Sequence, residues 1–309
     1  MDVLSQSLEQ LRLRGATYQR LVLQGGWVIS FDAEVRGIHI VERGQCELVA
    51  DGHPPCVLLP FDYVVLPRGG RHILRAVGVR RGQPVPIPTR PSENPLHVRA
   101  KGEQAPVTIA CGVFSFGVAS EHPVLEALAP VLVVASRTPG SPVTAHVESL
   151  LLELSSPRDG SNVVVARLSD VLLVHAIREF ASTLSCGAHA PASVLAGLQH
   201  PQVGAALRLM HEAPDHAWTV ERLARRVGLS RAAFADHFRK QVGETPLAYL
   251  TRWRLSLART LLRETREPLK IIAKRTGYGS AASLSLAFKR TLGQSPGSFR
   301  AAIDDRAAR

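Results

Sequence analysis

The sequence predicts an α+β protein in which an N-terminal β-barrel is followed by a helical linker and a C-terminal all-α domain. Three observations support this order. Short apolar runs recur through the first part of the chain, a segment of helical pattern occurs twice near the C-terminus, and basic residues are concentrated in the last third. Evenly spaced short strands are typical of barrels, and a duplicated segment indicates a repeated supersecondary unit. We expect the three parts to span residues 1–118, 119–200 and 201–309.

Composition limits the class of protein. A chain of 309 residues with 45% hydrophobic residues is long enough for two domains with cores of their own. No apolar run reaches the length of a membrane span, and the N-terminus does not have the pattern of a signal peptide. The four cysteines, Cys46, Cys56, Cys111 and Cys186, form no Cys-x-x-Cys pair, which fits a reducing compartment. We expect a cytoplasmic protein with no membrane partner.

The N-terminal part is predicted to consist of β-strands. Its apolar runs are separated by turns rich in Gly, Pro and Asp. The predicted strands cover residues 37–41, 46–49, 56–59, 63–66, 72–74 and 107–116. Residues 78–106 contain six prolines and five cations, which predicts an exposed excursion, either a cover for the barrel mouth or a disordered loop.

Two helices are predicted between the barrel and the C-terminal domain. Residues 144–155 are apolar on more than one side, and residues 162–184 carry an apolar stripe interrupted by His175 and Glu179. Helices of this kind have more apolar surface than one barrel covers. They predict either the interface of a homodimer or packing within one protomer.

The C-terminal domain contains a segment that occurs twice, fifty residues apart. Each position of Phe238–Pro246 is matched by a residue of the same kind in Phe288–Pro296, and Tyr249 is matched by Phe299. Each copy ends a short amphipathic run with an aromatic residue, two cations and a Gly-x-x-Pro sequence. One supersecondary unit has therefore been used twice.

Each copy ends a helix-turn-helix pattern. In the first, a short helix over 220–227 is followed by Gly228, which allows a tight turn, and by Ser230, which caps a second helix over 231–241. The second copy covers 269–292 and has a turn that is one residue longer.

A helical spacer joins the two units. Residues 247–264 carry leucines and Trp253 at helical spacing with four arginines outside this stripe, and at ~1.5 Å per residue the helix is about 27 Å long. Successive major grooves on one face of B-DNA lie ~34 Å apart. A rod of this length is able to place the second helix of each unit in adjacent turns of one duplex.

Charge separates the two ends of the chain. Residues 1–200 contain 17 basic and 17 acidic residues, whereas residues 201–309 contain 20 and 9, so the whole formal net charge of +11 belongs to the last third. A basic domain beside a neutral one indicates a polyanionic partner. Double-stranded DNA is the partner we expect.

Three runs in this region form a family pattern: Trp218–Ser230, Pro246–Leu262 and Ile272–Pro296. Together they resemble the AraC/XylS family of bacterial transcription regulators over residues 201–301. The resemblance implies a sequence-specific DNA-binding regulator whose N-terminal sensor binds a small-molecule effector. Such an effector would shift the orientation or dimerisation of the helical linker. RNA polymerase is a further implied partner if the protein is an activator.

The N-terminal domain is similar to the cupin barrel. Pro67-Arg68-Gly69-Gly70-Arg71-His72 resembles the second cupin motif, although Phe61 stands where that motif has a glycine. The carboxylate and paired histidines of the first cupin motif have no counterpart upstream of Gly44. The resemblance therefore implies a cupin-like sensor domain rather than a metal-dependent cupin enzyme.

Four side chains of this domain are candidates for effector or metal binding: His39, Cys46, His72 and Cys111. Strand alternation directs His39 into the barrel, and His72 is the ligand that remains of the second cupin motif. Two histidines and a thiolate suit Zn or Cu, and Cys46 alone is able to act as an oxidation sensor. The alternative is structural, because buried cysteines and hydrogen-bonded histidines are common in cores. The sequence requires no cofactor.

Alignment from the capping serines places the DNA-contacting positions on the second helix of each unit. They are Arg231, Ala232, Ala235, Asp236, Arg239 and Lys240 on the first helix and Ser280, Ala281, Ala282, Ser285, Leu286, Lys289 and Arg290 on the second. Family members commonly carry arginine where this chain has Asp236 and Leu286, and arginine suits bidentate contact with guanine. We expect modest base discrimination by the second reading helix, with cations at the helix ends gripping phosphates.

Two other classes of function are open at this point. A cupin-type enzyme fused to a DNA-binding module would need the metal ligands that the first cupin motif lacks here. A structural chromosome-binding protein would not need the capping and turn chemistry of two reading helices. We expect a regulator that is not an enzyme.

Overall fold

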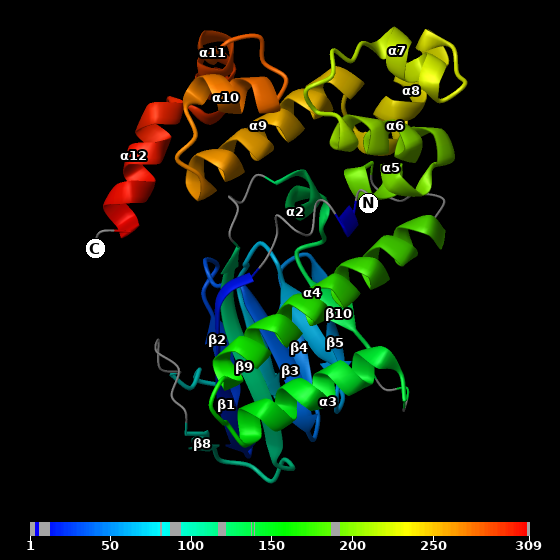
Figure 1. Ribbon diagram of the computed structural model, residues 1–309. Helices are drawn as coiled ribbons and strands as arrows, with labels where there is room; N and C mark the ends of the chain where they lie inside the picture. The colour runs from blue at the N-terminus through cyan, green and yellow to red at the C-terminus, as the bar shows by residue number, and fades with distance from the viewer. Residues whose placement is uncertain are drawn as a thin grey trace. The chain divides into compact units, whose positions relative to one another are not determined.

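The computed structural model describes residues 4–5, 13–80, 82–86, 94–116, 122–136, 138, 140–186 and 192–307. The described residues fall into two compact units, each built from separate stretches of chain. The sheet unit contains Arg12–Gly117 and Leu128–Ser182, and the helical unit contains Met1–Leu11, Val118–Ala127 and Thr183–Arg309. The predicted order, a sheet-rich domain before an all-α domain, is confirmed (Figure 1).

The strands of the sheet unit form two sheets. They are β1 (Leu13–Gln24), β2 (Val28–Phe31), β3 (Gly37–Arg43), β4 (Cys46–Ala50), β5 (His53–Leu58), β6 (Tyr63–Leu66), β7 (His72–Ala76), β8 (Leu96–Arg99), β9 (Val107–Phe116) and β10 (Leu132–Val134). One sheet has the order β10-β6-β3-β9-β1-β8 and the other β2-β7-β4-β5. Neighbouring strands are antiparallel except β1 and β8, which pair in parallel.

Both sheets direct alternate side chains into one apolar core. Leu21 of β1 and Ile109 of β9, from the larger sheet, share a fully buried cluster with Leu48 of β4 and Leu74 of β7 from the smaller sheet. Burial of a side chain of this size stabilises the fold by ~1.5–3 kcal/mol. The core therefore holds the two sheets together and leaves the outer face of the larger sheet to be covered by helices.

Two long helices cover that outer face, α3 (Pro142–Ser155) and α4 (Ser161–Cys186) (Figure 1). The Tyr18 hydroxyl on β1 lies 2.8 Å from Ser169 Oγ of α4, and the Tyr63 hydroxyl donates to the Leu172 carbonyl at 3.0 Å. Gly112 of β9 makes room for the first of these tyrosines, since a Cβ there would lie 2.5 Å from its ring. The side of the predicted 162–184 helix that faces the sheet therefore packs within the protomer.

Besides the helical residues Leu4 and Ser5, the described part of the helical unit contains nine helices. They are α2 (Pro123–Ala127), α5 (Val194–Gln199), α6 (Pro201–Glu212), α7 (Val220–Arg226), α8 (Arg231–Val242), α9 (Pro246–Glu264), α10 (Leu269–Arg275), α11 (Ala281–Leu292) and α12 (Pro296–Ala307). Across the part of the chain that the structure describes, no helix is both long and apolar enough to span a membrane.

Both predicted helix-turn-helix units are present, α7 with α8 and α10 with α11, joined by α9. Their turns begin alike: Gly228 and Gly277 adopt φ of 72° and 76°, the left-handed region that glycine tolerates. The next residue of each turn donates its backbone N–H to the first helix, Leu229 to Ala224 at 3.0 Å and Tyr278 to Ala273 at 2.8 Å. The extra residue of the second copy therefore lies after the shared part of the turn.

The duplicated segments also pack alike. In each copy the matched proline, Pro246 or Pro296, opens the next helix, α9 or α12. The matched rings lie edge to face, Phe238 with Tyr249 at a centroid distance of 6.0 Å and Phe288 with Phe299 at 5.6 Å. The sequence repeat is therefore a structural repeat, in which each reading helix is held by the helix that follows it.

Several elements have no counterpart among the predicted ones: β1, β2, β8, β10, α2, α5, α6 and α12. Part of the proline-rich excursion, residues 81 and 87–93, lies outside the described residues, while β8 occupies part of the remainder. The four arginines predicted outside the stripe of α9 are all partly buried, because α9 contacts other helices on more than one side.

Candidate functional site

The first reading helix, α8, is positioned by its two ends. Ser230 Oγ accepts a hydrogen bond from the Ala233 N–H at 3.2 Å, and Gly243 ends the helix with a φ of 90°. Phe234 and Phe238 are fully buried, so the opposite face of α8 is directed outward. On that face Arg231, Ala232, Asp236, Arg239 and Lys240 are exposed and Ala235 is partly exposed.

The second reading helix, α11, begins with a reciprocal capping box. Ser280 Oγ accepts from the Ser283 N–H and Ser283 Oγ accepts from the Ser280 N–H, each at 3.1 Å. Leu284 and Phe288 are fully buried. Of the predicted contact positions, Ser280, Ala282, Leu286, Lys289 and Arg290 are exposed, and Ala281 and Ser285 are partly exposed.

Exposed ion pairs hold some of the cations of the first unit. Arg231 pairs with Glu221 of α7, and Lys240 pairs with Asp236 one turn earlier at 2.8 Å. All four side chains are more than half exposed, so water and salt screen these pairs and phosphates are able to compete for the cations. Asp236 is thus already neutralised by its own helix.

In the sheet unit, His39 and His72 come from different sheets and meet in the interior. Their Nε2 atoms are 2.8 Å apart, and both side chains are buried. His72 Nδ1 lies 2.8 Å from the Gly70 carbonyl, an obligate acceptor, which makes His72 Nε2 the acceptor and His39 Nε2 the donor of the shared bond. Phe31 packs on both rings at 4.5 Å. Burial lowers the pKa of both imidazoles, so both are neutral at neutral pH.

The two cysteines proposed beside this pair lie in the same core. Cys111 is directly opposite His39 in the register of β9 and β3, whereas Cys46 belongs to β4 of the other sheet. Burial raises the pKa of Cys46 to about 12 and raises that of Cys111 as well, so both thiols are protonated. Within the described ranges, no three His, Cys, Asp or Glu side chains are placed to hold a metal ion.

Comparison with known proteins decides the family. A family model described as cupin matches residues 2–182, and a helix-turn-helix domain model matches residues 223–302. An AraC-like transcription regulator of Streptomyces lividans is 35% identical over 303 residues, which cover 97% of this chain and 98% of that protein. The chain belongs to the AraC-like transcription regulators. It is a sequence-specific DNA-binding transcription regulator with an N-terminal cupin domain, as predicted.

More distant relatives match over the same length. The RCS-specific HTH-type transcriptional activator RclR of Escherichia coli is 28% identical over 312 residues, 97% of each chain. Among solved structures, the DNA-binding domain of AdpA in complex with a target DNA is 32% identical and covers 35% of this chain and 96% of that chain, with a TM-score of 0.34.

One side chain of this AraC-type regulator that sequence reasoning missed is Arg254 of α9. Its guanidinium donates to the carbonyls of Pro214 and His216 at 2.7 and 2.8 Å, in the loop between α6 and α7. A Cβ at Gly277, in the turn of the second unit, would lie 2.6 Å from the same guanidinium. Arg254 therefore lies between the loop that precedes the first unit and the turn of the second. Its position directly after Trp253 in the second family run was the available signal.

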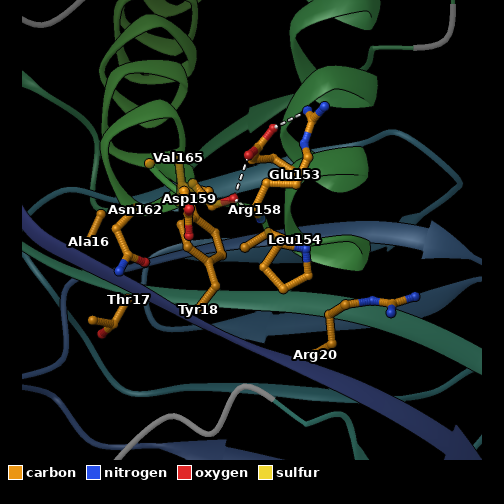
Figure 2. Close-up of a pocket in the computed structure, with 13 residues that line it drawn as sticks. Ala16, Thr17, Tyr18, Arg20, Glu153, Leu154, Arg158, Asp159, Asn162 and Val165 are labelled. Atoms are coloured by element: carbon orange, nitrogen blue, oxygen red, sulfur yellow. Dashed lines mark hydrogen bonds and ion pairs between the residues drawn. The ribbon is translucent and has the colours of Figure 1, made fainter.

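The sheet unit also contains a cavity of about 610 Å³ between β1 and the turn that joins α3 to α4 (Figure 2). Several polar groups of its lining are held by hydrogen bonds and ion pairs. Ser161 Oγ donates to the buried Glu153 at 2.5 Å, Arg158 pairs with the same carboxylate at 3.3 Å, and Arg20 pairs with Glu42 at 2.8 Å. The two contacts of Glu153 connect the end of α3 to the turn and to the first residue of α4.

Proposed function

We propose that this AraC-type regulator reads one operator with α8 and α11 in successive major grooves and that a small effector in the cupin domain controls this reading. The observation that carries the proposal is the duplicated, capped helix-turn-helix unit. Both copies expose one face and place two cations near the last turn of the reading helix. Exposed faces of this kind read base edges, while the cations at the ends fix the register on phosphates.

The two faces differ in the bases they favour. α11 presents Ala282 and Leu286, whose apolar groups suit thymine methyls, and Ser285, which is able to donate or accept. α8 presents Arg231, which suits guanine once it leaves Glu221. We therefore expect an operator in which the half read by α8 discriminates more strongly than the half read by α11.

For the effector we propose a site at the buried histidine pair. A Cβ at Gly37 would lie 3.2 Å from His39 Nε2, so the absence of a side chain there lets the imidazole pack against the backbone of β3. His39 Nδ1 is buried and has no hydrogen-bond partner within the described residues. A ligand that donates a hydrogen bond suits such an acceptor. The high pKa of Cys46 favours a polar effector over thiolate ligation or oxidation at this site.

We propose a homodimer formed through the turn end of the α3–α4 pair. Leu152, Val163 and Val164 are 63%, 65% and 42% exposed there, and exposed apolar side chains at neighbouring positions mark association surfaces. A second copy of the chain would bury them. RNA polymerase is the further partner we propose, since a full-length relative is an activator. DNA as the partner implies the cytoplasm. We further propose that the cupin domain has a sensing and not an enzymatic role.

The reading proposal is tested with the full chain on DNA fragments that the purified protein selects from random sequence. Lys289→Ala and Arg290→Ala are each expected to weaken binding on all fragments and to reduce the log–log salt slope by about 1. Lys101→Ala, an exposed cation of the sheet unit, is the matched control and leaves the slope unchanged. Equal slopes for all three variants would refute the contact at α11.

The effector proposal is tested by replacing the two histidines and the neighbouring candidate Cys46. The triple variant His39→Ala, Cys46→Ala, His72→Ala is expected to retain basal DNA binding and to lose any change in binding caused by Zn²⁺, Cu⁺ or a small-molecule library. Metal analysis of the purified wild type separates a bound metal from an organic effector. A variant that keeps the full response and only melts at a lower temperature would place the effector elsewhere.

A further inference from the structure

Helix α2 belongs to the helical unit although in sequence it lies between strands of the sheet unit. The chain leaves the sheet unit after β9, contributes α2 to the helical unit and returns at Leu128 before β10. α2 packs against α5, and Val124 and Leu125 are each only 1% exposed. The segment His122–Ala127, here called the strap, is therefore part of the packing of the DNA-binding unit while the sensor domain holds both its ends.

The ring of His122 is the first of a row of packed rings that extends from the strap to the first reading helix, α8. The buried His122 ring lies edge-on to Trp253 of α9 at 5.9 Å. Trp253 stacks on His211 of α6 at 3.8 Å, and His211 Nε2 lies 2.6 Å from the Tyr249 hydroxyl. Tyr249 packs in turn on Phe238 of α8 at 6.0 Å. Packed chains of this kind transmit a change in position when they have two discrete arrangements.

Two ion pairs also connect the strap to the end of α8. Arg252 of α9 pairs with Glu126 of the strap and, at 2.6 Å, with Glu244. Glu244 directly follows Gly243, the residue that ends α8. One guanidinium is thus shared between the strap and the turn that orients the first reading helix, so loss of the strap carboxylate changes the charge balance at that turn.

Helix α5 supplies a third connection. The Ser193 N–H, just before α5, donates to the Gln241 carbonyl of α8 at 2.8 Å. Gly197 of α5 lies so close to α8 that a Cβ there would be 2.7 Å from the Val242 side chain. Because the strap packs on α5 and α5 packs on the last turn of α8, the three form one continuous stack.

The second helix-turn-helix unit lacks the side chains that receive the strap. The fifty-residue repeat places Gln294 opposite Glu244, Ala302 opposite Arg252 and Ile303 opposite Trp253. Neither the shared guanidinium nor the indole has an equivalent there. The strap is therefore bonded through Arg252 to the end of α8, whereas Glu126 and the last turn of α11 only line the same small pocket.

We propose that the strap couples the sensor domain to the DNA-binding unit and that Arg252 is a positioning residue for α8. With the strap docked, the first reading helix is held in its DNA-binding orientation; when the sensor domain draws the strap away, α8 loses that support. The inference rests on the proposed reading of DNA by α8. Docked and undocked straps are the two states that an effector in the cupin domain would bias.

Hydrogen exchange of the full chain tests the proposal without DNA. Glu126→Lys places a second cation against Arg252 and is expected to speed exchange in the strap and, more than in α11, in α8. On DNA selected by the wild type, we expect its affinity to fall by roughly fivefold or more. The control is Glu148→Lys on an exposed site of α3, which makes the same change in charge. Added positive charge alone strengthens DNA binding, so the control is expected to bind equally well or better.

The possible outcomes distinguish a failure of the strap proposal from a failure of the proposal that α8 reads DNA. Faster exchange in the strap with unchanged exchange in α8 overturns the proposal. If Glu126→Lys leaves the strap docked, the double variant Val124→Asp, Leu125→Asp is used instead, because it removes the apolar contacts of the strap. Unchanged hydrogen exchange in α8 of that variant also overturns the proposal. If exchange in α8 follows the strap but Arg239→Ala and Lys240→Ala leave DNA binding intact, the reading by α8 is wrong and the coupling stands.

Discussion

Replacing Leu286 with arginine tests how α11 lies on DNA. Leu286 is 72% exposed, on the side of the helix away from the buried Leu284 and Phe288, so the substitution leaves the core of the second unit intact. The side chain of arginine reaches the guanine O6 and N7 atoms in a bidentate contact. Such a contact discriminates against the wrong base by ~1–3 kcal/mol, which corresponds to roughly fivefold to 150-fold in affinity.

The assay is fluorescence anisotropy on a selected operator and on derivatives in which each base pair facing α11 is changed in turn to G·C. Leu286→Arg is expected to bind one derivative more tightly by that factor and to gain little on the others. Leu286→Lys is the matched control, because it adds the same charge without the planar fork. A uniform gain for arginine, equal to that for lysine, would show that position 286 faces the backbone and that α11 is placed wrongly.

Other predictions follow from the same geometry. DNA affinity of the full chain is expected to fall linearly on a log–log plot against salt, by ~0.9 per phosphate neutralised, and a salt-independent affinity would contradict the assignment of the charge. Phe288→Ala is expected to destabilise the second unit by ~3–5 kcal/mol because the ring is fully buried against Phe299, which denaturation with a probe in α11 measures. The pKa of His122 and the pKa of His211 are both lowered to about 3, mainly by burial. The charge of Arg252 also lowers the pKa of His122, and His122 in turn lowers that of His211. Their contribution to stability is therefore complete only well above the unfolded pKa of ~6.5, and it falls by ~1.4 kcal/mol per histidine between pH 7.5 and 5.5. Strap exchange, corrected for its intrinsic rate, is therefore expected to accelerate on acidification.

The helix-turn-helix units were predictable because their signals are local. Caps, turn glycines and the i, i+4 spacing of Phe234 and Phe238 lie within a dozen residues of each other, and the repeat supplied two independent readings of one pattern. The strand β1 was missed for the opposite reason. Gly15 interrupts the strand pattern of Leu13–Gln24, where the register shifts between Arg14 and Thr17, and the pairing with β9 is a contact between distant segments.

The histidine pair of the cupin domain shows where sequence reasoning stops. Alternation correctly directed His39 inward, since its register partners belong to the core, but the 2.8 Å contact with His72 depends on two sheets facing each other. Cys46 was grouped with the histidines from strand order alone, and nothing in sequence sets its distance from them. The strap was missed because five helical residues are too few for a periodic pattern, and only tertiary packing assigns α2 to the helical unit.

Hydroxyl-radical footprinting of the full chain on a selected operator tests the central claim most directly, that α8 and α11 read successive major grooves. We expect each bound chain to protect two patches on one face of the duplex, ~10 base pairs apart. Removing Arg239 and Lys240 is expected to erase one patch, and removing Lys289 and Arg290 the other. A single patch, or two patches that both survive these changes, would contradict the account.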